Sequence, residues 1–299
     1  MMEAQNARDN RLTTAAWSYD QAYARNLGLI GPDDQSRLRH ATIGIPGLGG
    51  VGGIHLMTLA RMGIGGFNIA DADEFSVSNT NRQYGAFVST VGKDKGTVMA
   101  SFVRDVNPDI RLKHIRGFID EANIDEFLSG CDLVLDSLDA WAIETRLLLF
   151  RKCREKGIPV ISAGPIGFSA AMIVALPGSM SLDSYLAITP QMKTIEKFSR
   201  FIIGLTPKPY FLRYMNTGKV DMNQKNGPSV ASSVTLCAGF AAVEAMKILL
   251  GKGKVLGLPH FHYFDPYIGV FKRGYVPFGN RHPLQRLKIW YLLNYRLKS

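Results

Sequence analysis

The chain has 299 residues, of which 46% are hydrophobic and 20% are charged, and it carries three cysteines and a formal net charge of +10. This composition is typical of a folded globular protein with one large core or two modest ones. It excludes a disulfide framework, because the cysteines are few, odd in number and widely spaced, and it favours a reducing, cytoplasmic location. Residues 1–16 are polar and charged, which predicts a flexible arm and not a secretory signal.

The first half alternates strand-like and helical patterns, which predicts a doubly wound, mostly parallel α/β sheet. Short apolar runs predict strands at residues 42–45, 66–70, 110–115, 133–135, 160–162 and 172–176. Helical periodicity is found at residues 52–62, 95–106, 121–128 and 142–156. Ligands of such sheets bind at the carboxyl ends of the strands. We therefore expect residues 17–177 to form a core with a ligand site at that edge.

The second half breaks this alternation, but we expect it to belong to the same single domain, residues 17–299. Residues 178–227 are rich in proline and mixed charge and predict a lobe that covers the site. Residues 228–250 predict a long helix. We expect this helix to be buried in the fold rather than to span a membrane, because it contains Glu244 and Lys247.

The C-terminal extension contains two further predicted strands, residues 260–264 and 270–272. An amphipathic basic helix is predicted within 282–299, and we expect it to pack on the fold rather than to contact a membrane. Residues 193–225 hold seven Lys and Arg against two acids, and residues 266–299 hold seven against none. This charge predicts an anionic partner, an acidic protein or a nucleic acid, at the second half. A basic surface that merely faces solvent is the alternative.

A glycine-rich loop, containing Gly47, Gly49, Gly50 and Gly52, follows the first predicted strand. Glycines allow the tight turn and close backbone approach that a phosphate needs, and the next helix points its free N–H groups at the anion. Asp71 lies 19 residues after Gly52, just beyond the next strand, where an acidic residue meets a ribose hydroxyl. These two features fit an NAD- or FAD-dependent oxidoreductase as well as an ATP-binding enzyme.

Three further charged residues separate these two classes of enzyme. Arg82 and Lys95 are 13 residues apart, and Lys95 opens a predicted helix, so both side chains can flank a triphosphate and stabilise the charge of departing pyrophosphate. Asp139 follows a predicted strand and is placed to hold Mg²⁺ near the phosphates. A dinucleotide dehydrogenase has no need for this set. The sequence therefore predicts an ATP site with reaction at the α-phosphate.

In order and spacing, these residues resemble the ThiF/MoeB/HesA family, the bacterial relatives of the ubiquitin-activating enzymes. The resemblance runs from about Tyr23 to Leu250. Its matching segments are Tyr23-Ala24-Arg25-Asn26, Gly47 to Gly52, Asp71-Ala72-Asp73, Ser78 to Gln83, Lys95, Asn107-Pro108 and Asp136-Ser137-Leu138-Asp139.

The resemblance implies a Rossmann-like nucleotide-binding core and an adenylyltransferase that uses Mg-ATP. The family activates a carboxylate, usually the C-terminal glycine of a small ubiquitin-like protein. By position, the resemblance implies that Asp71 binds the ribose and that Asp139 binds the metal. The phosphates would be contacted by Asn79, Arg82 and Lys95.

Comparison with other members of the family implies a homodimer and argues against zinc binding and a cysteine thioester. Arg25 is implied to reach the γ-phosphate, in many members from the partner subunit. The second half lacks the family's two Cys-x-x-Cys pairs, so no zinc is expected, and residues 178–227 lack the cysteine of thioester-forming members. Cys131 and Cys237 lie in apolar segments that predict the core, and Cys153 lies far from the expected site, although its basic neighbours would lower its pKa. We therefore expect an acyl-adenylate of a protein or peptide, formed without a cysteine thioester.

Three alternatives remain open at this stage. One is a tRNA-modifying enzyme of the same family, like tRNA threonylcarbamoyladenosine dehydratase. That enzyme shares the local sequence of residues 79–83, and its tRNA substrate suits a basic surface. Another is a non-catalytic nucleotide-binding module that keeps the fold. The third is the NAD- or FAD-dependent oxidoreductase, which only the glycine loop and Asp71 support.

Overall fold

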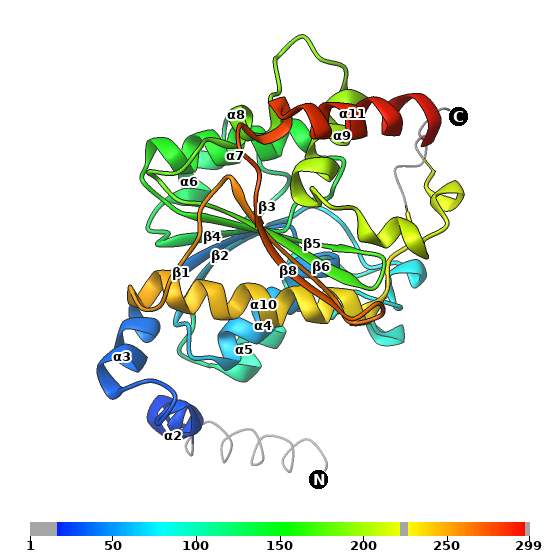
Figure 1. Cartoon of the computed structure of the whole chain (residues 1–299). Helices are drawn as coiled ribbons and strands as arrows, with labels where there is room; N and C mark the ends of the chain where they lie inside the picture. The colour runs from blue at the N-terminus through cyan, green and yellow to red at the C-terminus, as the bar shows by residue number, and fades with distance from the viewer. Residues whose placement is uncertain (1–16, 222–226, 297–299) are drawn as a thin grey trace.

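The computed structural model describes residues 17–221 and 227–296 (Figure 1). The predicted arm, residues 1–16, therefore lies outside the described residues, as do residues 222–226 of the predicted lobe and the last three residues of the chain.

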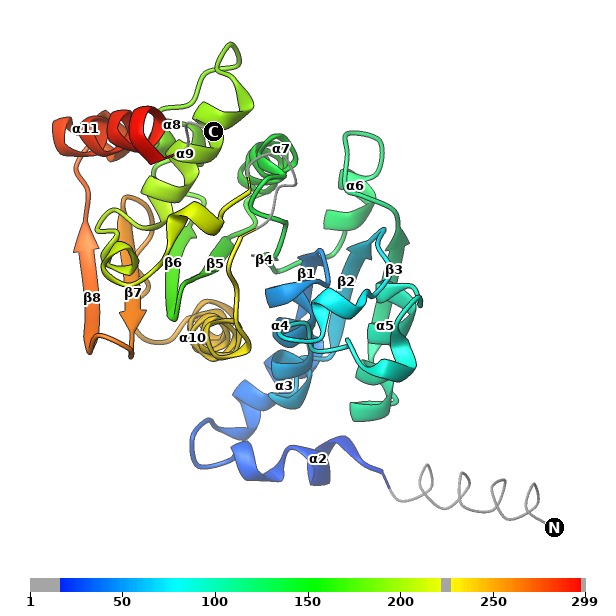
Figure 2. The same ribbon diagram turned by 90° about the vertical axis from the view of Figure 1, so that its right-hand side faces the viewer.

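One eight-stranded sheet organises the described part of the chain, and Figure 2 shows its strands side by side in the order β3-β2-β1-β4-β5-β6-β7-β8. The strands are β1 (Thr42–Pro46), β2 (Gly66–Asp71), β3 (Arg111–Arg116), β4 (Leu133–Asp136), β5 (Val160–Ile166), β6 (Ser169–Ala175), β7 (His260–Asp265) and β8 (Val270–Tyr275). Strands β1 to β5 pair in parallel, and β6 to β8 continue the sheet as antiparallel strands. The predicted fold class, a doubly wound and mostly parallel sheet, is confirmed.

The strand order reverses direction at β1. From β1 the chain moves outward to β2 and β3, and then it returns to place β4 on the other side of β1. The loops after β1 and β4 therefore leave the sheet on opposite faces and open a crevice between them, which is the usual ligand position in open α/β sheets. The glycine loop follows β1, and Asp139 follows β4.

Helices cover both faces of the sheet (Figure 1). One face carries α3 (Pro32–His40), α4 (Gly50–Arg61), α5 (Lys95–Val106) and α10 (Ala231–Leu250), and the other carries α6 (Ile124–Leu128), α7 (Ile143–Glu155), α8 (Leu182–Leu186) and α9 (Thr194–Leu205). Successive strand residues point to opposite faces. Leu133 and Leu135 accordingly pack in the first core, and Val134 packs in the second.

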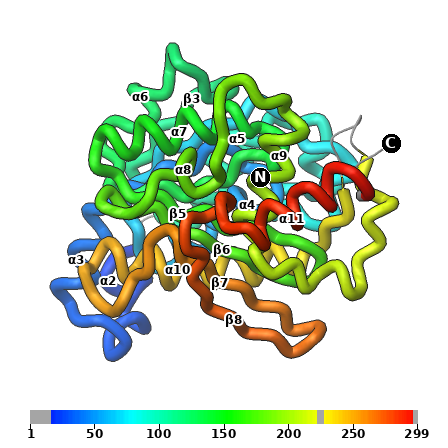
Figure 3. Tube along the Cα trace, turned by 45° about the horizontal axis from the view of Figure 1, so that its top comes forward, coloured from blue at the N-terminus to red at the C-terminus, as the bar shows by residue number. Residues whose placement is uncertain are grey.

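The predicted lobe and tail contain the helices that differ most from expectation. Residues 178–227 include α8, α9 and two short 3-10 turns, Tyr210–Arg213 and Thr217–Lys219, none of which was predicted. In the tail, α11 (Pro283–Tyr291) is followed by a single π-helical turn, Leu292–Arg296. Figure 3 shows α11 running beside α9, which it contacts. The predicted packing of this helix on the fold is confirmed.

One helix within the described residues, α10, is long and apolar enough to cross a membrane by length and composition alone. Half of its most apolar window is buried in the fold, where the helix packs against α4, β5 and β6. Small residues permit this close approach, because Ala238, Ala241 and Ala245 are almost fully buried. The prediction of a buried core helix is confirmed.

Candidate active site

The loop between β1 and α4 closes tightly over the end of the sheet. Gly47 has a φ of +100°, a conformation that favours glycine, and its N–H donates to the carbonyl oxygen of Ala70 at 2.7 Å. A Cβ atom on Gly52 would lie 1.8 Å from the carbonyl oxygen of Gly47, so the first turn of α4 fits only without a side chain there. Gly49 is the N-cap, and no side chain caps the helix. The N-terminus of α4 is therefore open to an anion.

Asp71 ties this loop to the end of β2. Its Oδ2 accepts a hydrogen bond from the N–H of Leu48 at 2.6 Å, and its Oδ1 accepts one from the N–H of Asp73 at 2.8 Å. Burial raises the pKa of Asp71 above its ordinary value, against the opposing effect of these two donors. Each carboxylate oxygen can accept a second hydrogen bond, so the group remains able to bind a ribose hydroxyl.

Two cations face the same region. The Nη1 of Arg82 donates to the carbonyl oxygen of Ser78 at 2.9 Å and to Oδ1 of Asn81 at 3.0 Å. In the described part of the chain, Arg82 forms no salt bridge. Lys95, which begins α5, is 5% exposed and pairs with Asp73 across 3.1 Å. Arg82 therefore carries a positive charge that no carboxylate neutralises within these residues, and Lys95 shares its charge with one.

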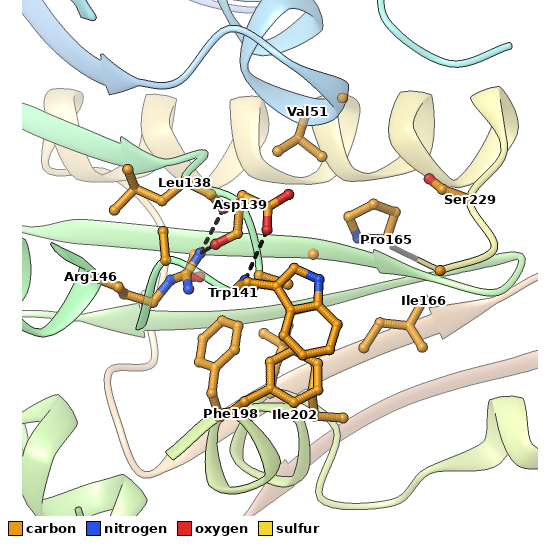
Figure 4. A pocket seen from close by; sticks show the side chains of 18 of the residues that line it. Val51, Leu138, Asp139, Trp141, Arg146, Pro165, Ile166, Phe198, Ile202 and Ser229 are labelled. Carbon is orange, nitrogen blue, oxygen red and sulfur yellow. Dashed lines mark hydrogen bonds between the residues drawn. The ribbon is translucent and has the colours of Figure 1, made fainter. Parts of the chain in front are cut away.

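The loop after β4 is held by a buried ion pair. Asp136 pairs with Nε of Arg146 at 2.7 Å and also accepts a hydrogen bond from Ser162. The Nη2 of Arg146 donates to the carbonyl oxygens of Leu138 and Asp139 at 2.6 and 3.2 Å. Figure 4 shows Arg146 beside Leu138 and Asp139. Arg146 thus fixes the backbone that carries Asp139, whose own carboxylate is exposed.

A single large cavity of about 910 Å³ joins these groups. Eight predicted site residues line it: Gly47, Gly49, Gly50, Asp71, Asn79, Arg82, Lys95 and Asp139. Gly52 does not line the cavity and instead allows the loop to close. The structure therefore brings together residues that are up to 92 positions apart in the sequence.

Arg25 does not join this group. It lies on a 3-10 turn, Ala24–Asn26, and is exposed. Its neighbour Tyr23 donates a hydrogen bond to Ala60, and Asn26 donates one to Met62, both at the C-terminal end of α4. The glycine loop lies at the other end of this 12-residue helix, about 18 Å away at 1.5 Å per residue. Arg25 is therefore not part of the cavity of its own chain.

The sequence prediction missed several cavity residues. Asp73 holds Lys95, and Gln83 lies against Gly49 with an Oε1 that has no hydrogen-bond partner among the described residues. Both residues belong to segments that match the family. The sequence therefore indicated that these segments lie near the site, but not what the two side chains contact. Trp141 and Phe198 stack at the other end of the cavity. No sequence pattern indicated this contact, because the two residues lie 57 positions apart on unrelated elements.

The fold and the glycine loop define the class of this protein: a doubly wound α/β protein with a glycine-rich loop and an uncapped helix N-terminus at the point where strand order reverses. The chain belongs to the ThiF family, whose model matches residues 23–276. The predicted ThiF/MoeB/HesA membership is thereby confirmed. Members of this family use ATP for adenylation, and relatives are named as adenylyltransferases, which supports an adenylyltransferase-type enzyme.

The relatives include two kinds of named enzyme. The tRNA threonylcarbamoyladenosine dehydratase of Haemophilus influenzae is 31% identical over 243 residues, covering 76% of this chain and 92% of that protein. The SAMP-activating enzyme E1 of Haloferax volcanii is 28% identical over 237 residues, covering 78% of this chain and 77% of that protein. The solved structure of Escherichia coli tRNA N6-threonylcarbamoyladenosine dehydratase matches with a TM-score of 0.57 at 26% identity, covering 78% of this chain and 95% of that chain.

Proposed function

We propose that this protein uses Mg-ATP to adenylate a carboxylate of a protein or peptide. The observation that carries the proposal is the convergence of the glycine loop, Arg82, Lys95 and Asp139 on one cavity. A site for a neutral ligand has no need to gather around one space a buried ammonium, an open helix N-terminus and a guanidinium that forms no salt bridge within the described residues. A site that must stabilise a departing pyrophosphate requires such groups.

The chemistry follows from these positions. A substrate carboxylate oxygen attacks the α-phosphorus of ATP, a new O–P bond forms, and the bond from that phosphorus to the bridging oxygen breaks. The leaving pyrophosphate takes up negative charge, which Arg82 and Lys95 offset, while Asn79 stands beside the phosphates and Asp71 accepts a hydrogen bond from the ribose. Binding both reactants in one cavity removes most of the entropic cost of their encounter.

Asp139 is the residue that fits a metal ion. Its exposed carboxylate offers a hard oxygen donor to the cavity, and among the described residues only one of its oxygens is engaged, by the backbone N–H of Trp141 at 2.9 Å. Mg²⁺ in nucleotide sites commonly takes one or two carboxylates and completes its coordination with phosphate oxygens and water. Bound there, Mg²⁺ would neutralise phosphate charge.

The cysteines support a mechanism without a covalent thioester. Cys131, Cys153 and Cys237 are free and buried. Burial raises the pKa of all three thiols, to about 12 for Cys131, so none is available as a thiolate. For Cys153 burial outweighs its basic neighbours, contrary to the expectation from sequence. We therefore propose that a nucleophile of a partner captures the acyl-adenylate, in a reducing, cytoplasmic setting.

Mg-ATP binding, measured by calorimetry, is the first test. Arg82→Ala removes a charge-assisted hydrogen bond to phosphate and should weaken binding about 10- to 100-fold. Arg104→Ala, which removes an exposed arginine of α5 outside the cavity, should not weaken binding.

Pyrophosphate exchange in the presence of a carboxylate substrate is the second test. The exchange rate should fall about 10²- to 10³-fold in Asp139→Ala and stay normal in Asp105→Ala, another α5 surface change. Normal exchange in both Arg82→Ala and Asp139→Ala would refute the mechanism.

A second candidate, a tRNA-modifying dehydratase, is favoured by the relative that matches over most of its length and by the basic second half. Part of that positive charge is already neutralised by ion pairs, because Lys197 pairs with Glu144 and Arg200 pairs with Glu196. The exposed remainder includes Arg213, Lys272 and Arg286. Salt-sensitive tRNA binding would favour this candidate, and indifference to tRNA at low salt would eliminate it.

A further inference from the structure

The cavity has a second end that differs in chemistry from the first. Trp141 stacks on Phe198 with ring centroids 3.9 Å apart and planes inclined by 2°. The same cavity is lined by Ile166 at the end of β5, by Ile202 on α9, and by Leu287 and Trp290 on α11, which contacts α9. Figure 4 shows Trp141 between Asp139 and Phe198, with Ile166 beside it. Apart from Lys288, which lines the cavity between Leu287 and Trp290 on α11, these side chains are aromatic and aliphatic.

The triphosphate and the ribose of the nucleotide have no use for this apolar end. Triphosphate and ribose must keep polar partners when they leave water. The partners suited to them, Asp71, Arg82 and Lys95, belong to the other end of the cavity. A volume of about 910 Å³ also lies near the upper end of the usual range for ligand pockets. The apolar end therefore suits an apolar group rather than these polar parts of the nucleotide.

The two ends meet at Asp139. Its Oδ1 accepts a hydrogen bond from the backbone N–H of Trp141 at 2.9 Å, which holds the backbone of Trp141 next to the residue that we propose as the metal ligand. A carboxylate that attacks the α-phosphate must lie near Asp139. Whatever group that carboxylate carries then extends toward Trp141 and α11.

The wall formed by α11 is anchored before any ligand arrives. Gln285 and Ile289 are buried against the fold, and the ammonium of Lys288 donates to the carbonyl oxygen of Pro207. Leu287 and Trp290, however, remain 59% and 51% exposed. Large apolar side chains left open beside a cavity mark a ligand-binding surface, because covering them is favourable.

We propose that the apolar end holds the group attached to the activated carboxylate, and that the substrate carboxylate carries a large apolar side group, preferably an aromatic ring. This inference rests on the proposed adenylation and specifies its substrate. It contrasts with the glycine carboxylate usual in the family, which would leave Trp141, Leu287 and Trp290 uncovered.

Pyrophosphate exchange with matched small carboxylates tests the proposal. N-acetylphenylalanine should support exchange with a kcat/KM at least about tenfold higher than N-acetylglycine, since one well-filled apolar pocket contributes that much. Leu287→Asp places a charge in the pocket wall and should abolish the preference. Leu284→Asp is the matched control, because Leu284 is 60% exposed on the same helix but does not line the cavity. Equal or better exchange with N-acetylglycine would overturn the proposal.

The same comparison identifies the source of the aromatic acid. A higher rate with N-acetylphenylalanine than with 3-phenylpropionate indicates the C-terminal residue of a peptide, and the reverse order indicates a free aromatic acid. Both orders support the apolar subsite, provided that propionate and N-acetylglycine are poor substrates.

Tryptophan fluorescence separates this inference from the proposed function. Two of the three tryptophans of the chain, Trp141 and Trp290, line the cavity. Saturable quenching by 3-phenylpropionate, weakened about tenfold or more by Leu287→Asp but not by Leu284→Asp, would support the subsite even if no carboxylate gave exchange. Exchange with N-acetylglycine alone, without quenching by the aromatic acids, would instead leave adenylation standing and remove the subsite.

Discussion

Single residues of this protein show how burial changes ionisation away from the site as well as in it. His55 lies on the buried side of α4, immediately behind the glycine loop, and is 1% exposed. Its Nδ1 has no hydrogen-bond partner among the described residues, and burial lowers the pKa of the imidazole to about 3. The ring is therefore neutral in the folded protein well below the pH at which an ordinary histidine takes up a proton.

This neutral histidine predicts a loss of stability in mild acid. In the unfolded chain, His55 takes up a proton below its ordinary pKa of 6.5. The unfolded state then binds more protons than the folded state, so the free energy of unfolding falls as pH decreases, by up to about 1.4 kcal/mol per pH unit. Urea unfolding between pH 6.5 and about 5.5, above the range in which ordinary carboxylates titrate, should show this slope.

The variant His55→Leu isolates the effect. It keeps a side chain of similar size but cannot be protonated, so its stability should depend less on pH over the same interval. A smaller slope should remain, because burial also lowers the pKa of His262. Identical slopes in the two proteins would show that His55 is not kept neutral by the fold.

At the scale of elements, the contact between the β1 loop and α4 depends on one missing side chain. The Cβ of an alanine at position 52 would collide with the carbonyl oxygen of Gly47, which is backbone and cannot rotate away. At position 50 the nearest atom would lie 4.0 Å away, on Val234. Both glycines are in the first turn of the same helix.

The two alanine variants should therefore differ sharply. Gly52→Ala should lose at least about 2–3 kcal/mol of unfolding free energy and weaken Mg-ATP binding, because the loop must open to admit the methyl group. Gly50→Ala should be neutral or slightly stabilising, since alanine is the better helix former. Urea unfolding of both variants provides the measurement. Equal stabilities would mean that the loop reorganises at little cost.

The elements that could be predicted from the sequence are those built by local rules. The parallel strands are short apolar runs with clear ends, and α5 spans Lys95–Val106 as its periodicity indicates. Residues such as Asp71 and Asp139 could be placed together, because parallel strands end at one edge of the sheet. Strand β6 begins at Ser169, earlier than predicted, since its antiparallel pairing with β5 extends it beyond the apolar run.

The apolar end of the cavity could not be predicted in this way. It forms where α7, α9 and α11 meet, and no local pattern relates Trp141, Phe198 and Leu287. Each of these side chains fits equally well in an ordinary amphipathic helix. Only the packing of α11 against α9 shows that they face one space. The nucleotide end follows from motifs, whereas the substrate end follows from tertiary packing.

For the whole molecule, the position of Arg25 decides whether one chain is a complete enzyme. The family resemblance assigns Arg25 to the γ-phosphate, yet in this chain it lies beyond the C-terminal end of α4. We therefore propose a homodimer in which Arg25 of each chain serves the cavity of the other. Residues that act across a two-fold interface do so reciprocally, so each dimer contains two composite sites.

Mixed dimers test this arrangement directly. Arg25→Ala and Asp139→Ala should each abolish most pyrophosphate exchange as pure proteins. When the two variants are coexpressed, half of the dimers should be mixed, and each mixed dimer has one site that retains both groups. Recovery of about a quarter of wild-type activity is therefore expected, and it should copurify with a dimer in sedimentation. If the mixture stays inactive, or if Arg25→Ala alone is fully active, Arg25 does not act in the partner's site, and the cavity of one chain must be sufficient for the reaction.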